Sequence, residues 1–248
     1  MCAINGFNFK DEKLIKEMNR LTSHRGPDGT GFFLDDGISL GHNRLSIIDL
    51  SKNAGQPMTS ADNNLIITYN GEIYNFKELK KELAGYNFRT ESDTEVILAA
   101  YQKWGVDCVK KLNGIFAFAL WDRSENVLYL ARDRMGEKPL YYGFSANSFL
   151  FGSELKSLQQ YPGFRGELES EVLERYLRFG CVGGQQSIFK DVFKLPPGSL
   201  LKVSLADIKA GKRPQPAQWW SAVDAARSAC QSGSVSSEQA LNNVEQAL

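Results

Sequence analysis

The 248-residue sequence is poor in the side chains that build metal sites and disulfide frameworks. It contains two histidines, His24 and His42, and their separation does not match the short spacing of zinc ligands, so we expect no metal in this chain. Its four cysteines lie far apart and form no CxxC pair. This usage argues against a disulfide framework and favours a reducing, cytoplasmic setting.

The sequence also lacks an excess of charge and a long apolar segment. It has 29 basic and 29 acidic residues, so its formal net charge is zero and no nucleic-acid partner is implied. No stretch approaches the roughly 20 apolar residues of a membrane span, and no basic stretch with an apolar core suggests a secretory signal. Apolar content of 42% is that of an ordinary globular protein of one or two domains.

Strand-like and helix-like segments come in blocks rather than in strict alternation. This pattern predicts an α+β fold with largely antiparallel sheets. The segments 140–144 and 149–152 are expected to continue the sheet formed by 115–121 and 127–131. Strands are expected at 2–9, 30–34, 38–48, 65–69, 115–121, 127–131, 140–144, 149–152 and 199–203, and helices at 11–21, 76–83 and 94–104.

Cys2 stands directly behind the initiator methionine. If Met1 is removed, one residue carries a thiol nucleophile and a free α-amine. An α-amine has an unperturbed pKa of about 7.7–8.0, so part of it is unprotonated near neutral pH and can act as a base. Cys2 would then supply both a nucleophile and its general base. The alternative is a small buried residue that opens a strand.

Five short motifs follow Cys2 along the chain. They are 24–29 (HRGPDG), 42–49 (HNRLSIID), 69–75 (YNGEIYN), 92–95 (SDTE) and 132–142 (RDRMGEKPLYY). Together with Cys2, this order closely resembles the class II glutamine amidotransferases, whose nucleophile is N-terminal. The residues within the motifs are most similar to those of the glutamine-dependent asparagine synthetases. The resemblance runs from Cys2 to about Trp220.

This resemblance implies a specific fold and domain organisation. The fold would be the N-terminal nucleophile αββα sandwich, in which two largely antiparallel sheets are stacked between helical layers. Residues 2–205 would form the class II glutaminase domain, 206–237 a loop and linker, and 238–248 the first helix of a synthetase domain absent from this chain. In that last segment Leu241, Val244 and Leu248 share one helical face.

The activity implied is hydrolysis of L-glutamine to L-glutamate and ammonia through a Cys2 thioester. The Ser-Gly-Gly-x-Asp-Ser loop of the ATP-dependent synthetase domain does not occur in the sequence. No cofactor is therefore expected here, and ATP and magnesium are expected only for the synthetase domain, which would be the partner. Two alternatives stay open: a non-catalytic glutamine-binding or docking module, and the glutaminase domain of an enzyme that amidates sugars for surface polysaccharides.

Amide hydrolysis requires donors that receive the developing oxyanion, and Asn70-Gly71 suits this role. A side-chain amide and an unhindered backbone N–H can point at one oxygen, and glycine lets the backbone approach closely. The alternative is a plain hairpin turn, because Asn-Gly is a common two-residue turn. The resemblance assigns the pair to the oxyanion hole, so Cys2, Asn70 and Gly71 are the predicted catalytic residues.

Arg44 is predicted to bind the substrate's α-carboxylate. It lies in what reads as an apolar strand, where a solvated charge is awkward, and a guanidinium binds a carboxylate with two parallel hydrogen bonds. The alternative is an edge-strand arginine paired with Asp49. The resemblance assigns Arg44 to the carboxylate.

Acceptors for the substrate's α-amine are predicted from the same resemblance. Asp93 and Glu72 match the positions of the family's acceptors, although Asp93 alone could equally be the N-cap of a helix. Leu45, Ile47 and Ile48 complete the predicted substrate-binding set.

The resemblance also implies roles for two further motifs. The loop 25–28 is expected to support the site from behind. The segment 132–142 is expected to face the partner domain and the route of ammonia, where residue chemistry alone would allow an exposed hairpin.

Overall fold

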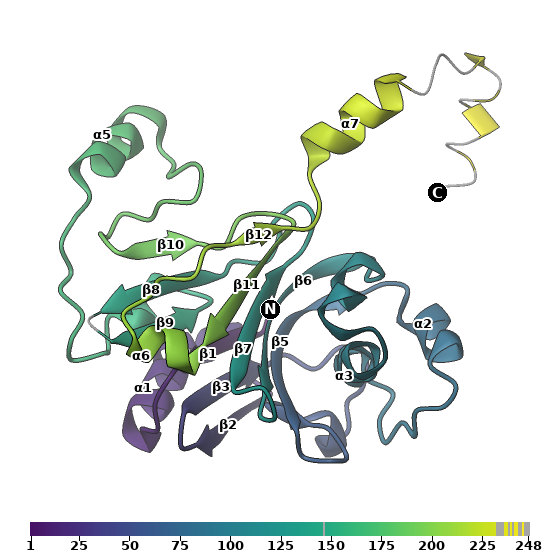
Figure 1. Ribbon diagram of the computed structural model, residues 1–248, viewed down its shortest axis with the longest axis horizontal. Coiled ribbons are helices and arrows are strands. Elements are labelled where there is room, and N and C mark those ends of the chain that lie inside the picture. Colours follow the sequence, from purple (N-terminus) through teal and green to yellow (C-terminus); the bar gives the residue numbers. More distant parts are fainter. Residues whose placement is uncertain (146, 232–235, 238, 240, 243–244, 246–248) are drawn as a thin grey trace.

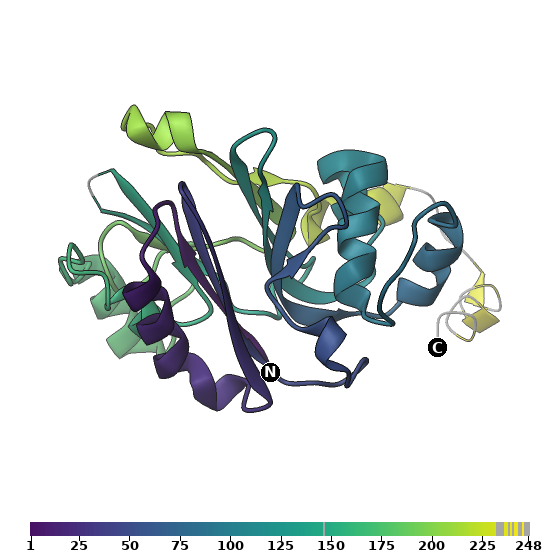
Figure 2. The same cartoon turned by 90° about the horizontal axis from the view of Figure 1, so that it is seen from below.

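The computed structural model describes residues 1–145, 147–231, 236, 237, 239, 241, 242 and 245. Two sheets of six strands are stacked face to face, and helices cover their outer faces (Figures 1 and 2). The order of layers is helix, sheet, sheet, helix. This arrangement confirms the predicted α+β fold with an αββα sandwich.

The first sheet contains the strand that follows Cys2. Its strand order is β10-β8-β9-β1-β3-β2, and all its pairings are antiparallel. Its strands are β1 (Ala3–Phe7), β2 (Gly29–Asp35), β3 (Ile38–Arg44), β8 (Tyr141–Ser145), β9 (Ser148–Gly152) and β10 (Val192–Lys194).

The second sheet is also antiparallel, in the order β12-β11-β7-β6-β5-β4. Its longest pairing joins β5 and β6 over nine residues. Its strands are β4 (Met58–Thr59), β5 (Leu65–Ile73), β6 (Gly114–Asp122), β7 (Val127–Arg132), β11 (Ser199–Ser204) and β12 (Ala217–Gln218).

One predicted sheet assignment is wrong. The strands β8 and β9 do not continue the sheet of β6 and β7; they belong to the first sheet, where β9 pairs with β1. The prediction assumed that consecutive strands are neighbours, which is only a tendency. The hairpin of β8 and β9 is instead part of the first sheet. Its side chains Tyr142, Phe149 and Phe151 pack into the apolar layer between the two sheets.

Helices shield the outer face of each sheet. On the first sheet, α1 begins after Asp11, whose Oδ1 accepts a hydrogen bond of 2.9 Å from the Leu14 amide, and it packs Ile15 and Met18 against Phe7. On the second sheet, α3 provides the cover (Figure 2). The helices are α1 (Glu12–Thr22), α2 (Phe76–Glu82), α3 (Asp93–Trp104), α4 (Leu155–Leu158), α5 (Ser170–Phe179), α6 (Leu205–Lys209) and α7 (Ala222–Gln231), with 3-10 turns η1 (Ser23–Arg25), η2 (Lys52–Ala54) and η3 (Gly105–Lys110).

The strand β5 is buried on both faces. Ile66 points into the apolar layer between the sheets, and Ile67 points toward α3 on the opposite side. Both side chains are fully buried. Each contributes about 1.5–3 kcal/mol to the free energy of folding, so β5 is held firmly between two apolar layers.

The strand predicted over 38–48 ends early, at Arg44. Its neighbours end there too, since Arg44 pairs with Gly29, the first residue of β2, and Asn43 pairs with Ala3, the first residue of β1. Without a partner on either side, the following residues form a loop. Arg44 is therefore the last residue of β3, and the expected continuation of this strand over 45–48 does not form.

The strand predicted over 65–69 is longer than expected and contains Asn70 and Gly71. The hairpin turn considered for this pair is therefore wrong. Gly71 is required by close packing: a Cβ at this position would lie 2.3 Å from the Ile115 carbonyl oxygen and 2.7 Å from the Phe116 Cα.

The loop and linker predicted over 206–237 contains regular structure. The helix α6 buries Ile208 in the layer between the sheets, β12 pairs with β11, and α7 contains four alanines, which are strong helix formers. The polar composition of the segment concealed these features. In the helix predicted over 238–248, Val244 and Leu248 lie outside the described residues, and Leu241 is exposed.

Candidate active site

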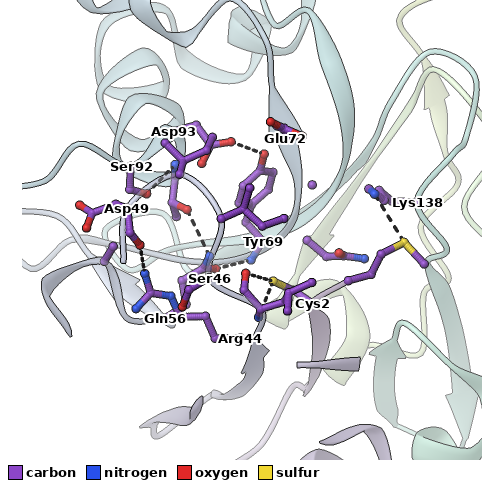
Figure 3. A pocket seen from close by; sticks show the side chains of 18 residues that line it. Cys2, Arg44, Ser46, Asp49, Gln56, Tyr69, Glu72, Ser92, Asp93 and Lys138 are labelled. Atoms are coloured by element: carbon purple, nitrogen blue, oxygen red, sulfur yellow. Dashed lines mark hydrogen bonds between the residues drawn. The ribbon is translucent and has the colours of Figure 1, made fainter. Parts of the chain in front are cut away.

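All nine predicted site residues line one pocket (Figure 3). The pocket lies where β1, β3 and β5 approach the first turn of α3. Its predicted lining residues are Cys2, Arg44, Leu45, Ile47, Ile48, Asn70, Gly71, Glu72 and Asp93, and its further lining residues are Met1, Ser46, Asp49, Ala54, Gln56, Tyr69, Ser92, Thr94 and Lys138.

The two sheets contribute different parts of this pocket. Cys2 directly precedes β1 and Arg44 ends β3, so both come from the first sheet. Asn70 and Gly71 lie in β5 of the second sheet, and Asp93 begins α3, which covers that sheet. The pocket is complete only when both sheets are in place.

The Cys2 thiol is held by the backbone of Leu45. The Leu45 amide donates to Sγ at 3.3 Å, and the thiol lies 3.6 Å from the Leu45 carbonyl oxygen. Burial raises the pKa of Cys2, and the Leu45 amide offsets this only in part. The thiol is therefore protonated at neutral pH, and a base must remove its proton before it can attack.

The loop 25–28 supports Cys2 from behind, as the resemblance implied. The Arg25 Nε donates to the Cys2 carbonyl oxygen at 3.0 Å, and its Nη1 pairs with Glu154 at 3.2 Å. Asp28 accepts a hydrogen bond of 2.7 Å from the Ser46 amide. These contacts fix the backbone on both sides of the thiol.

Asn70 presents a buried donor to the pocket. Its side chain is 1% exposed, and its Nδ2 has no hydrogen-bond partner among the described residues. A buried donor without a partner is costly, and one that lines a pocket is suited to pair with a ligand atom. Asn70 Nδ2 is thus available to an oxygen atom in the pocket.

The Gly71 amide points away from β6. Phe116, which pairs with Gly71, donates its N–H to the Asp133 carboxylate at 3.2 Å and accepts from the Asp133 amide at 2.8 Å. Phe116 therefore directs its polar groups away from β5, and in an antiparallel ladder this makes the Gly71–Phe116 pair a non-hydrogen-bonded one.

Alternate residues of β5 direct their amides to the same side. On that side the Tyr69 amide donates to Gln56 Oε1 at 2.7 Å, and the Ile73 amide donates to Asp93 Oδ2 at 3.0 Å. Gly71 lies between them, facing the pocket. Its amide and Asn70 Nδ2 can therefore both serve an oxygen atom bound beside Cys2.

Arg44 is oriented by the loop that follows it. Its Nη1 donates to the Ser51 carbonyl oxygen at 2.8 Å, and its Nη2 donates to the Asp49 carbonyl oxygen. The Asp49 carboxylate instead accepts from the Ser51 and Glu91 amides. The predicted alternative, an Arg44 paired with the Asp49 carboxylate, is therefore wrong. The guanidinium keeps further N–H groups for a carboxylate in the pocket.

Asp93 is not the N-cap of α3, which corrects the alternative considered for it. Ser92 is the cap, because its Oγ accepts from the Thr94 amide at 3.0 Å. Asp93 Oδ2 accepts from the Tyr69 hydroxyl at 2.6 Å and from the Ile73 amide at 3.0 Å. Burial raises the pKa of Asp93, and these donors offset part of that effect. The carboxylate is thus held rigidly at the pocket wall.

The remaining predicted residues are less enclosed. Glu72 is half-buried beside Tyr69, on the far side of the pocket from Arg44 (Figure 3). Leu45 and Ile48 are half-buried, and Ile47 is 63% exposed, so the loop after β3 offers mainly its backbone to a ligand.

Nine of the lining residues were not predicted, and three of them, Gln56, Tyr69 and Lys138, have polar side chains that bear on the site. Tyr69 and Lys138 lie in motifs that were recognised, and a tyrosine in a buried strand signals a hydroxyl that needs a partner. Gln56 has no such signal. Its Oε1 accepts from the Tyr69 amide, and its Nε2 donates to Thr94 Oγ1 at 3.1 Å.

The described residues contain no group of three histidine, cysteine, aspartate or glutamate side chains suited to a metal ion. None of the described helices combines the length and apolar character that crossing a membrane requires.

The fold is shared with two solved enzyme structures. A glutamine phosphoribosylpyrophosphate amidotransferase from B. subtilis, complexed with ADP and GMP, superposes with a TM-score of 0.63 over 88% of this chain and 49% of its own. An allosteric regulatory enzyme of purine biosynthesis superposes with a TM-score of 0.64. Both are 18% identical in sequence, so the likeness shows a shared fold.

Sequence comparison identifies the family. The family model of the glutamine amidotransferase domain matches residues 1–220, and the chain belongs to this family. It is 45% identical over 190 residues to asparagine synthetase [glutamine-hydrolyzing] 1 of Bacillus subtilis, covering 76% of this chain and 30% of that protein. It is 40% identical over 221 residues to a putative asparagine synthetase of Methanocaldococcus jannaschii, covering 79% of this chain and 42% of that protein. The chain thus matches less than half the length of these relatives.

The buried His42 makes the stability of the fold depend on pH. Burial lowers its pKa from 6.5 to about 4. The folded protein therefore binds fewer protons than the unfolded chain between these values. The resulting stabilisation is complete above pH 6.5 and is lost as the pH falls through 4; it is on the order of 3 kcal/mol. Urea unfolding at pH 4–7 should show a shallower pH dependence in His42→Gln than in the wild type, and equal slopes would contradict this origin.

Proposed function

We propose that this domain hydrolyses L-glutamine to L-glutamate and ammonia through a thioester on Cys2. The observation that carries the proposal is the composition of one pocket. A half-buried thiol, an unpaired amide donor, a backbone N–H, a guanidinium and a buried carboxylate line it together. These are the groups that hydrolysis of an amino acid's side-chain amide requires.

The thiol and the α-amine of Cys2 would perform the first step once Met1 has been removed. The amine takes the Sγ proton, and Sγ attacks the glutamine Cδ. The negative charge that forms on the amide oxygen is received by Asn70 Nδ2 and the Gly71 amide. Preorganised donors of this kind supply a large part of the rate enhancement in acyl transfer.

The tetrahedral intermediate collapses when the Cδ–N bond breaks. The protonated α-amine gives its proton to the departing nitrogen, which leaves as ammonia, and a Cys2 thioester is left behind. The same amine then removes a proton from water, which attacks Cδ. Release of L-glutamate returns the proton to Sγ, so each turnover consumes one water molecule.

Three charged side chains that line the pocket would recognise the amino-acid group of glutamine. Arg44 is already oriented by two main-chain carbonyls, and its free N–H groups suit a carboxylate. Asp93 and Glu72 would accept the α-ammonium, with Asp93 held in place by Tyr69. Opposite charges at fixed positions select an α-amino acid whose side chain reaches Cys2.

The names of the relatives support a proposal for the use of the ammonia. Their names are those of glutamine-hydrolysing asparagine synthetases, and they are longer than the region matched here. We propose that the ammonia passes to a synthetase domain, which would use ATP and magnesium to form asparagine. The free cysteines Cys2, Cys108, Cys181 and Cys230 accord with a cytoplasmic enzyme.

Replacement of the nucleophile should abolish turnover. With removal of Met1 verified by mass spectrometry, Cys2→Ala should release no glutamate above background, and Cys2→Ser should be severely impaired because a hydroxyl is harder to ionise than a thiol. Calorimetry with glutamine should still detect binding to Cys2→Ala. Equal glutamate release by wild type and Cys2→Ala would refute the proposed reaction, and binding without any turnover by the wild type would favour a non-catalytic glutamine-binding module.

Replacement of Arg44 by lysine should chiefly weaken glutamine binding. Lysine keeps the charge but loses the planar fork, and a hydrogen bond to a charged group contributes about 1.5–3 kcal/mol. The Michaelis constant should therefore rise roughly 10- to 150-fold. Steady-state kinetics would contradict the assignment if the Michaelis constant stayed at the wild-type value.

Asp93 should make glutamine binding sensitive to acid. Because burial raises its pKa above the ordinary value, the carboxylate loses its charge at a higher pH than an exposed aspartate does. The wild-type Michaelis constant should rise as the pH falls through this pKa, while Asp93→Asn should show a raised value with little pH dependence. Ser92 caps α3 in both proteins, so a wild-type-like profile in Asp93→Asn would exclude Asp93 as the ammonium acceptor.

A further inference from the structure

His42 is a polar residue in the apolar layer between the two sheets. It lies in β3, two residues before Arg44, and is fully buried. Its neighbours across the first sheet are Ile4 in β1 and Gly31 in β2. A position of this kind is ordinarily filled by an apolar side chain.

The imidazole forms a hydrogen bond from the first sheet to the second. Its Nε2 lies 3.0 Å from the Tyr69 carbonyl oxygen in β5. Since a carbonyl oxygen only accepts, the proton is on Nε2. A second hydrogen bond joins the same two strands in the opposite direction. The hydroxyl of Thr68, the residue before Tyr69 in β5, donates to the Gly41 carbonyl oxygen in β3 at 3.0 Å. Two strands that belong to different sheets are thus joined at successive residues.

Histidine has an evident disadvantage at this position. Its Nδ1 is buried without a hydrogen-bond partner among the described residues, and burial lowers its pKa to about 4, so the ring is neutral at physiological pH. An apolar side chain would avoid the cost of the unpaired Nδ1. The contribution specific to histidine is therefore the bond from its Nε2 to Tyr69.

The two strands joined by this bond carry opposite halves of the pocket. Tyr69 directly precedes Asn70 and Gly71, which face the pocket. On the other side, β3 ends at Arg44 and pairs with β1 directly behind Cys2, with Asn43 opposite Ala3. The bond therefore spans the junction between the nucleophile and the predicted oxyanion donors.

We propose that His42 is a positioning residue that sets the separation between Cys2 and the donors of Asn70 and Gly71. The proposal rests on the proposed glutaminase function, and it assigns His42 no contact with substrate. Its effect is transmitted through the Tyr69 carbonyl. Because a misplacement of 1 Å can cost about 100-fold in rate, small shifts between the sheets should be visible in kcat.

Two polar substitutions separate the hydrogen bond from simple packing. In His42→Gln the amide nitrogen can occupy the place of Nε2, whereas in His42→Asn the donor stops at about the place of Nδ1. We expect His42→Asn to lose tenfold or more in kcat, with a Michaelis constant within about threefold of wild type. His42→Gln should keep kcat within about threefold of wild type.

Leu201→Ala is the matched control for lost stability. Leu201 is fully buried in the same layer between the sheets, but it lies in β11, which β7 and β6 separate from β5. Melting temperatures of all variants would be measured beside their kinetics. The expected result is that Leu201→Ala is destabilised at least as much as His42→Asn and yet retains its kcat.

Either of two kinetic outcomes would overturn the proposal: a wild-type kcat in His42→Asn, or equal losses in folded His42→Asn and His42→Gln. Hydrogen exchange gives a test that does not depend on turnover. The amides of residues 69–72 should exchange faster in His42→Asn than in His42→Gln or Leu201→Ala, and equal exchange would also overturn it. An inactive wild type would refute the glutaminase function alone, because the exchange measurement would still decide the role of His42.

Discussion

The apolar layer between the two sheets is the constraint on which the rest of the structure depends. It buries side chains of both sheets, including Ile4 and Leu40 from the first and Ile66 and Trp121 from the second. Since the pocket takes its thiol and guanidinium from one sheet and its amide donors from the other, packing in this layer determines the geometry of the site. Dense packing suits that purpose, because protein interiors resist compression and transmit small displacements.

The class of fold and the membership of the pocket could be predicted from the sequence. Strands in blocks indicated antiparallel sheets, and the resemblance placed Cys2, Arg44, Asn70 and Asp93 in one site before any geometry was known. The nine predicted residues meet because the start of β1, the loop after β3, the second half of β5 and the first turn of α3 converge on one pocket. Their chemical roles remain predictions that the kinetic measurements address.

Other features could not be predicted because they depend on contacts between distant segments. The hairpin of β8 and β9 reads like a continuation of β7, and only packing across the core assigns it to the first sheet. The loop after Arg44 reads as a strand because its isoleucines are apolar, yet no neighbouring strand extends far enough to pair with it. The position of Gln56 in the pocket depends on its hydrogen bonds to the Tyr69 amide and the Thr94 hydroxyl, and the sequence does not indicate either bond.

The position of Met1 has a practical consequence for handling the protein. Met1 lines the pocket, its side chain is 56% exposed, and its sulfur lies 3.5 Å from Lys138 Nζ at the pocket mouth (Figure 3). An affinity tag fused before Met1 would crowd the opening and keep the Cys2 nitrogen in a peptide bond. The helix α7, by contrast, extends away from both sheets (Figure 1). Fusions and surface attachment are therefore best made beyond α7, where they leave the entrance to the pocket clear.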